Sequence, residues 1–159
     1  MVENFTPQEL TAIAAAPMIA GLAVAMVDLG IVSSVIEATA LSKEIAGAAK
    51  KYPNNTIIQS VFSEAVLRSG AVKPEKPEIK PEEVQSGAVV DKAIDSINAA
   101  LTVLDGKATP EEIQEYKAFI YASANAVANA AGSGLFGSGA KVSNKEAAAL
   151  GKLKATLAI

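Results

Sequence analysis

The sequence predicts an all-α fold, a single-domain bundle of about six helices built around an apolar central first helix. Alanine supplies 32 of the 159 residues, helix N-cap patterns recur along the chain, and the apolar residues between them follow helical spacing. No stretch shows sustained alternation of apolar and polar residues, so we expect no β-sheet. The chain is long enough to bury a core, and we expect one helical domain over residues 1–159.

The first expected helix spans residues 7–27 and begins at the capping pattern Thr6-Pro7-Gln8-Glu9. Its last 18 residues carry no charge, and a helix of that length covers about 27 Å, close to the thickness of a bilayer core. The many alanines, the central Pro17 and Gly21, and the absence of lysine or arginine before Lys43 disfavour a membrane span. We therefore expect a helix buried by its neighbours, in a cytoplasmic protein.

The second and third expected helices span residues 30–51 and 56–69. Asp28 lies just before the second helix and is expected to cap it, and Asn55 is expected to cap the third. The second helix has only a weak inner face, which spacing assigns to Val35, Thr39, Ser42 and Ile45.

The fourth expected helix spans residues 82–105 and begins after Pro81, with acidic residues in its first turn that suit the helix dipole. Its apolar residues recur at steps of three and four and predict a seam for a facing helix: Val90, Ile94, Ile97, Leu101 and Leu104. The connection before it, at about 72–81, interleaves prolines with charges. We expect a solvated spacer between two helices of one bundle there, with a Pro-rich docking peptide as the alternative.

The fifth and sixth expected helices span residues 110–131 and 144–157. Each begins at a capping box, formed by Thr109 with Glu112 and by Ser143 with Glu146. Apolar spacing predicts two buried stripes, which comprise Ile113, Tyr116, Ile120 and Val127 in one helix and Leu150, Leu153 and Leu157 in the other. Tyr121 lies five positions after Tyr116, so the two rings cannot both face the core.

The glycine-rich segment 132–141 joins the last two expected helices. It contains the pattern G-x-G-x-x-G and part of a phosphate-binding loop, but it follows a helix and lacks an adjacent Gly-Lys pair, so no phosphate site is expected. Apolar residues on such a loop either fold back onto the core or contact a partner. Leu135, Phe136 and Lys141 are therefore the candidate interaction residues.

The composition excludes several kinds of chemistry. The chain has no cysteine and no histidine, which rules out disulfides, thiolate nucleophiles, zinc fingers and histidine-based triads. Asp91 and Asp95 form an i, i+4 pair that is expected on a solvated face, and we assign no catalytic, cofactor or metal site. A net charge of −3 with one arginine, Arg68, disfavours nucleic-acid binding.

Three segments together resemble a group of all-helical prokaryotic proteins of unknown function. They are TPQEL leading into AAAPMIAGLAVAMVDLG, INAALTVLD before TPEEIQEYKAFI, and the C-terminal AGSGLFGSGAKVSNKEAAALGKL. The group opens with a TPEE-type box and an AP-containing apolar helix, and closes with a glycine/phenylalanine loop before an S-x-x-E-capped helix. The Pro-rich stretch 74–81 departs from this pattern. The resemblance implies a helical fold and carries over no site residues.

Alanines at four-residue spacing favour close contacts between helices. They occur at Ala12, Ala16 and Ala20, and again at Ala118, Ala122, Ala126 and Ala130. Half of the residues are apolar and 19% are charged, so we expect a homo-oligomer, with a dimer favoured. The expected function is therefore non-enzymatic, through self-association and contacts with a protein partner. The alternative is a carrier of a small apolar ligand or lipid between alanine-rich helices.

Overall fold

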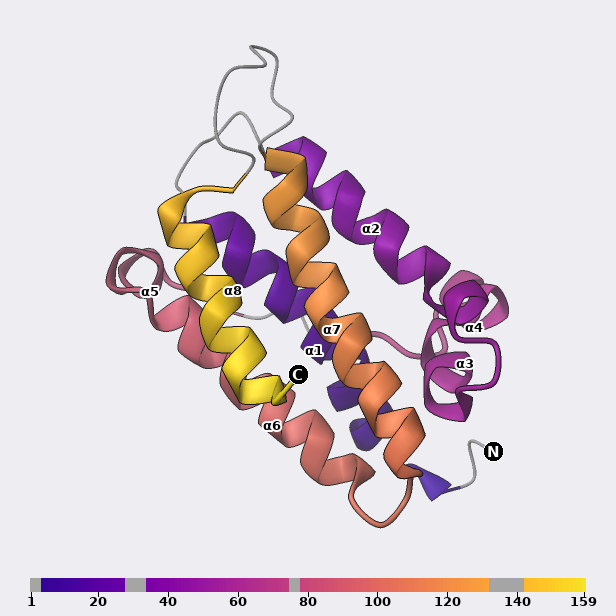
Figure 1. Ribbon diagram of the computed structural model, residues 1–159. Helices are drawn as coiled ribbons and strands as arrows, with labels where there is room; N and C mark the ends of the chain where they lie inside the picture. The colour runs from indigo at the N-terminus through magenta and orange to yellow at the C-terminus, as the bar shows by residue number, and fades with distance from the viewer. Residues whose placement is uncertain (1–3, 28–33, 75–77, 132–141) are drawn as a thin grey trace.

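The computed structural model describes residues 4–27, 34–74, 78–131 and 142–159 (Figure 1). Within these ranges the chain forms helices and no strand, which confirms the all-α prediction. The helices are α1 (Pro7–Val27), α2 (Ser34–Lys51), α3 (Thr56–Phe62), α4 (Glu64–Ser69), α5 (Pro81–Ser86), α6 (Ala88–Leu104), α7 (Pro110–Ala131) and α8 (Asn144–Leu157).

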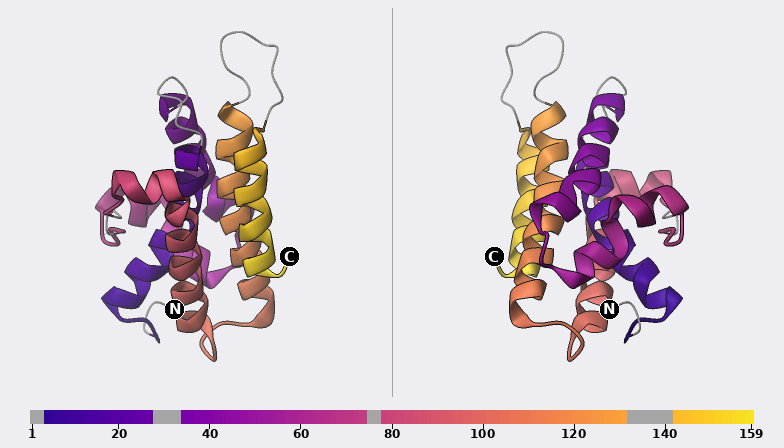
Figure 2. Two further views of the ribbon diagram at one scale, coloured as in Figure 1. Left: turned by 90° about the vertical axis from the view of Figure 1, so that its left-hand side faces the viewer. Right: turned by 90° about the vertical axis from the view of Figure 1, so that its right-hand side faces the viewer.

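Helix α1 is central in the bundle, as the sequence predicts. It packs most extensively against α6 and α7, and it also contacts α2, α3, α5 and α8. Figure 2 shows α7 and α8 together on one side of the molecule and α5 on the opposite side. Small side chains dominate the buried surface of α1, which lets neighbouring helices approach closely. The buried residues of α1 are Ile13, Ala14, Ala16, Pro17, Ala20, Gly21, Ala23 and Val24.

Among the described helices, α1 is the one that is long and apolar enough to cross a membrane, with a mean hydropathy of 2.2 over its most apolar window. In the bundle 44% of that window is buried. The remaining apolar side chains, Met18, Ile19, Leu22 and Met26 among them, are half-buried. A core helix and a membrane span share this length and composition, so the absence of a membrane span stays a prediction.

Two of the six expected helices are each divided in the structure. The helix expected over 56–69 is broken at Ser63, whose extended backbone (φ −64°, ψ 150°) ends α3 and begins α4. The helix expected from residue 82 is broken at Gly87, which adopts the left-handed conformation (φ 78°, ψ 4°) between α5 and α6. Glycine tolerates that conformation without steric cost, so Gly87 redirects the chain between two helices that the spacing alone would join.

Hydrogen bonds confirm four of the expected helix starts, at Thr6, Asn55, Thr109 and Ser143, whereas the start expected at residue 30 lies outside the described residues. The Thr6 amide donates to Glu9 at 2.8 Å, and the Thr6 hydroxyl accepts from the Glu9 amide at 3.2 Å. Ser143 and Glu146 form the same reciprocal pair at 2.7 and 3.1 Å. Asn55 Oδ1 accepts from the Ile58 amide at 3.0 Å and caps α3. Each cap satisfies amides that the first helical turn leaves without a partner.

The inner face predicted for the second helix is wrong at two of its four positions. Ile45 is half-buried against the core, as expected, and the side chain of Val35 lies outside those that the structure describes. Thr39 and Ser42 are exposed, whereas Leu41 and Ala48 are buried. Leu41 lies against Gly21 of α1, where an added Cβ would approach Leu41 Cδ1 to 2.6 Å. The face is set by this close crossing of two helices, and spacing within α2 could not reveal it.

The seam predicted in the fourth helix is correct in part. Val90, Ile97 and Leu104 are buried in α6, but Ile94 and Leu101 lie at the margin of the core. The positions beside the seam are filled by buried small or branched residues that face α1, namely Val89, Ala93 and Ala100. The predicted stripes of α7 and α8 are buried except for Ile113, which is half-buried.

The proline-rich connection between α4 and α5 is only partly solvated. Val72 and Ile79 near its two ends are half-buried and pack against the core. Lys92 of α6 donates to the backbone carbonyl of Glu78 at 2.5 Å and pairs with Glu83 at 2.9 Å. The described parts of the connection are therefore attached to the bundle at its α5 end.

Candidate functional site

The candidate interaction residues Leu135, Phe136 and Lys141 lie outside the described residues, and so does Asp28. The described part of the chain offers six other features for a functional reading. They are two polar arrangements, an acidic pair on α6, two hollows and the outer surface of α8. Their geometry separates the features that hold the fold together from those that face solvent.

The first polar arrangement joins the N-termini of α3 and α7 through one carboxylate. Glu112 Oε1 accepts from the Thr56 amide at 3.0 Å and from the Thr56 hydroxyl, and Glu112 Oε2 accepts from the Thr109 amide at 2.9 Å. Asn55, fully buried, donates to the Glu112 carbonyl at 3.0 Å and to Glu115 Oε2 at 2.9 Å. One side chain thus caps two helices that lie more than 50 residues apart in the sequence.

The electrostatics of Glu112 follow from these contacts. Partial burial raises the pKa of the Glu112 carboxyl, but hydrogen bonds from the Thr56 hydroxyl and from the Thr109 and Thr56 amides outweigh it and lower the pKa to about 2. A carboxylate that already accepts from both threonines is ionised and fully engaged. It is therefore a structural cap, with no free oxygen for proton transfer or metal binding.

The second polar arrangement lies inside the core, where the Tyr116 hydroxyl donates to the Ile13 carbonyl at 2.7 Å. In an uninterrupted helix that carbonyl would accept from the amide of residue 17, but Pro17 has no amide hydrogen. Burial raises the pKa of Tyr116, which keeps its hydroxyl protonated as a donor. Tyr116 therefore satisfies the acceptor that Pro17 leaves open. Tyr121 is half-buried, consistent with the expectation that the two rings do not both face the core.

The acidic pair of α6 does not form a metal centre within the described ranges. Asp91 and Asp95 are both exposed, as expected. No group of three or more acidic side chains close enough to hold a metal ion occurs in that part of the chain. The pair is a solvated feature of the outer face of α6.

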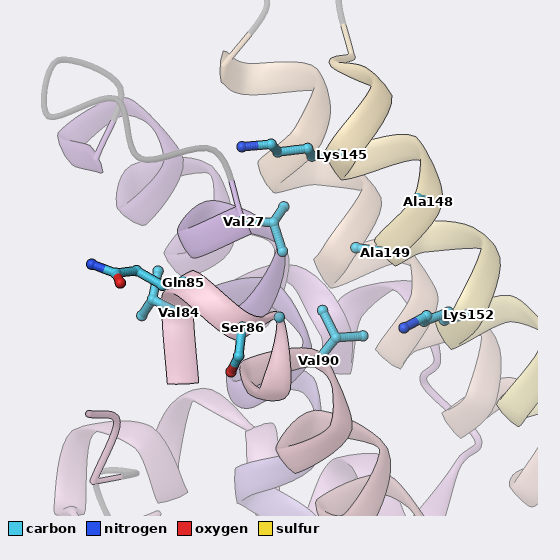
Figure 3. A pocket seen from close by; sticks show the side chains of 10 residues that line it. Val27, Val84, Gln85, Ser86, Val90, Lys145, Ala148, Ala149 and Lys152 are labelled. Carbon is cyan, nitrogen blue, oxygen red and sulfur yellow. The ribbon is translucent and has the colours of Figure 1, made fainter. Parts of the chain in front are cut away.

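A hollow of about 300 Å³ lies where the end of α1, the α5–α6 junction and α8 meet (Figure 3). Its apolar surface comes from Val27 of α1, Val90 of α6 and Ala149 of α8. From α8, Lys145 extends toward the end of α1 near Val27, and Lys152 points toward Val90 of α6 (Figure 3). The arrangement combines an apolar surface with two cations on one flank.

A second hollow, of about 430 Å³, lies between α2 and α4 and has a different character. Its lining includes Lys50, Glu64, Leu67 and Arg68. Arg68 and Glu64 already form an ion pair at 2.6 Å. The lining thus carries an acid beside the cations Lys50 and Arg68, whereas the hollow beside α8 has cations and no acid.

The outer surface of α8 is a ridge of small residues. Ala147, Gly151 and Ala155 follow one another at four-residue intervals and are all exposed. A Cβ built on Gly151 would meet no atom within 4 Å, so the described fold does not require glycine at this position. Sequence reasoning missed the ridge because alanine is common throughout the chain, and only burial shows which alanines remain outside.

No protein-family model, no curated protein and no solved structure matches this chain. The resemblance to a group of helical prokaryotic proteins therefore stays a prediction. Function has to be argued from the described residues.

Proposed function

We propose that this is a non-enzymatic cytoplasmic protein that acts through self-association, in a homodimer that pairs α8 of one copy with α8 of a second. The observation that carries the proposal is the exposed ridge formed by Ala147, Gly151 and Ala155. A two-fold axis places the same patch of both copies together, so one helix face is enough to build the contact. Small residues at four-residue spacing let two helix backbones approach closely.

The glycine at the middle of the ridge is the strongest support. Glycine inside a helix is about 1 kcal/mol less favourable than alanine. In α1 that cost has a reason within the chain, since any side chain at Gly21 would collide with Leu41. Gly151 has no such neighbour, and neither has Gly47 of α2. Gly151 differs because exposed alanines lie four residues to either side of it, where Gly47 has Lys43 and Lys51. A contact with a second copy would account for a small residue at this position. The ridge buries little aromatic or branched surface, so we expect a weak dimer.

The test replaces Gly151 with a bulky residue that the monomer can accommodate. Gly151→Leu meets open space and raises helix propensity, so helicity is expected to be unchanged while the dimer is lost. Native mass spectrometry of protein purified without detergent should give twice 16.2 kDa for the original chain and 16.2 kDa for the variant.

Gly47→Leu is the matched control. Gly47 lies inside α2, and a Cβ there also meets nothing within 4 Å, so the same replacement should fold and leave the dimer intact. A dimer that survives Gly151→Leu, or an original chain that is monomeric at every concentration, contradicts the proposed interface. Recovery of the chain in the soluble fraction without detergent also checks that α1 does not span a membrane.

A protein partner is the other part of this proposal, and the segment 132–141 is its candidate surface. The support is compositional, because Leu135 and Phe136 are apolar residues within a glycine-rich segment. Phe136→Ala is expected to leave helicity unchanged and to weaken binding to such a partner. If the substitution unfolds the protein, Phe136 belongs to the core and the surface assignment is wrong.

A carrier of a small ligand is the second candidate function, and the hollow beside α8 is the observation that favours it. The hollow lies next to Ala148 and Ala149 of α8. The sequence instead places such a ligand between alanine-rich helices, whose alanine faces lie in α1 and α7. Co-purification of an added mass of a few hundred daltons in the same mass spectra would identify such a ligand. A clean mass without ligand would count against carriage.

A further inference from the structure

We infer that the hollow beside α8 binds an amphipathic anion, an alkyl chain that ends in a carboxylate, as in a free fatty acid. The inference deepens the second candidate function, on which it rests, because it names a ligand class for the hollow. The hollow adjoins the proposed dimer contact through Lys152 but does not include the ridge. Gly151 and its ridge neighbours Ala147 and Ala155 do not line the hollow.

The floor of the hollow selects an apolar tail. Val27 of α1, Val90 of α6 and Ala149 of α8 lie around the hollow, and Val84 lines it from α5, farther to the left in Figure 3. Val90 and Ala149 are each 3% exposed. Val27 and Val84 are half-buried, so apolar surface remains for a ligand to cover. Covering such surface contributes about 25 cal/mol for each Å² removed from water. A volume of about 300 Å³ is at the lower end of ligand sites, which suits a medium-length chain.

The flank of the hollow selects a negative charge. Lys145 and Lys152 are seven residues apart, two turns of α8 or about 10 Å along its axis, and both line the hollow from the α8 side (Figure 3). Neither forms an ion pair with a described residue, whereas Lys92 and Lys107 are paired with Glu83 and Glu9. No residue that lines the hollow is acidic.

Three acids of the described ranges adjoin lining residues in the sequence. Asp91 follows Val90 but is exposed on the outer face of α6 and does not line the hollow. The other two are engaged elsewhere. Glu146, between the two lysines in sequence, is 3% exposed and accepts from the Ser143 amide as the cap of α8. Glu83, just before the lining residue Val84, pairs with Lys92. The two amines beside the hollow are therefore left to an external anion, and an anion attached to an apolar tail uses both the amines and the valines.

Isothermal titration with sodium decanoate tests the inference, with decanol as the uncharged probe of equal chain length. Decanoate is expected to bind at one site per chain, and decanol at least tenfold more weakly, because it leaves the amines unpaired. Lys145→Gln combined with Lys152→Gln should reduce decanoate affinity at least tenfold and leave decanol binding unchanged. Equal affinity for decanoate and decanol, or no effect of the two lysine substitutions, overturns the anionic part of the inference.

Two further variants locate the tail. Ala149→Leu fills the buried floor of the hollow and should abolish binding of both probes. Ala148→Leu, at the exposed rim, should also abolish binding of both probes and leaves the core undisturbed. Lys154→Gln is the matched control, because Lys154 lies on the same helix but over the Tyr121 ring, 6.0 Å from its centroid. The Lys154→Gln variant should bind decanoate as tightly as the original chain. Binding that survives both alanine replacements places the ligand elsewhere and refutes the site.

The titration is repeated in the Gly151→Leu background. Decanoate binding in that background is expected to match the original chain, since Gly151 does not line the hollow. Failure of the dimer proposal and failure of the ligand site are thereby distinguished. Binding to vesicles of anionic phospholipid without binding of free decanoate would assign the two lysines to a membrane surface and would also refute the site.

Discussion

At the residue scale, two side chains compensate for irregularities that the backbone creates. Tyr116 donates to the Ile13 carbonyl that Pro17 deprives of its helical partner. Glu112 accepts from both threonines at the starts of α3 and α7, and so joins two helix N-termini. Each of these two side chains hydrogen-bonds to a segment distant in sequence, Tyr116 to the Ile13 carbonyl and Glu112 to the Thr56 amide. Removing either side chain leaves those groups without a hydrogen-bond partner.

Tyr116→Phe is expected to lower the free energy of unfolding by about 1–3 kcal/mol, the cost of a buried carbonyl without a donor. Urea denaturation followed by circular dichroism measures it. Tyr121→Phe, on the half-buried ring of the same helix, should change stability little. The cost of Tyr116→Phe should shrink in a Pro17→Ala background, where residue 17 regains an amide for Ile13. An equal cost in both backgrounds would argue against this role of Tyr116.

The lowered pKa of Glu112 predicts a pH dependence of stability. Its pKa falls from 4.5 to about 2 on folding, so its contribution is fully present above about pH 5 and is lost as the pH drops toward 2. With allowance for the partial exposure of this carboxylate, we expect its contribution to the free energy of unfolding to be about 1–2 kcal/mol. Glu112→Gln should lower the free energy of unfolding by that amount at pH 7. It should also flatten the curve of unfolding free energy against pH between pH 5 and 2. Glu111→Gln, on an exposed neighbour, should leave the curve unchanged.

At the scale of helices, glycines separate two kinds of contact. Gly21 lies where α1 crosses α2, and an added Cβ would come within 2.6 Å of Leu41 Cδ1. Gly151 lies on the outside of α8 with no neighbour within 4 Å. The first glycine is required by packing within the chain, whereas the second is available for a contact between chains.

Substitutions at the two glycines should change stability in opposite directions. Gly21→Val overpacks the α1–α2 crossing and is expected to lower the free energy of unfolding by about 1–3 kcal/mol. Gly151→Ala adds a helix-favouring residue in open space and should raise it by up to about 1 kcal/mol. Both values are measured by denaturation at a protein concentration low enough to keep the chain monomeric. Destabilisation by Gly151→Ala under those conditions would mean that the monomer itself needs this glycine.

At the scale of the whole molecule, the distribution of charge is uneven although the net charge is only −3. The ridge of α8 has Lys152 on one side and Lys154 on the other, and the acid of this helix, Glu146, is buried. Pairing of α8 with α8 therefore brings lysines of two copies together. Repulsion between them opposes the dimer until ions screen it.

Salt is accordingly expected to strengthen the dimer. Between about 0.01 M and about 0.15 M ionic strength the screening length falls from about 30 Å to about 8 Å, and the dimer Kd should fall severalfold over that range. Sedimentation velocity at both ionic strengths measures it, and Lys152→Gln with Lys154→Gln should weaken the salt dependence. A dimer that dissociates as salt is added would instead indicate an acidic surface as the partner of α8.

The sequence by itself determined the helical class, the helix starts and much of the core. Capping boxes such as Thr109 with Glu112 are confirmed because their hydrogen bonds span three residues and depend on local chemistry alone. Stripes such as Leu150, Leu153 and Leu157 were predictable because large apolar residues at helical spacing leave one choice of inner face.

Only the tertiary structure decided which face of α2 turns inward, that Gly87 divides α5 from α6, and that Tyr116 serves the carbonyl left open by Pro17. It also brought Lys145 and Lys152 of α8 beside Val27, more than 100 residues earlier in the chain. These features depend on close approach between helices rich in alanine and glycine. Spacing within one helix carries no information about such contacts, because small residues fit several faces equally well.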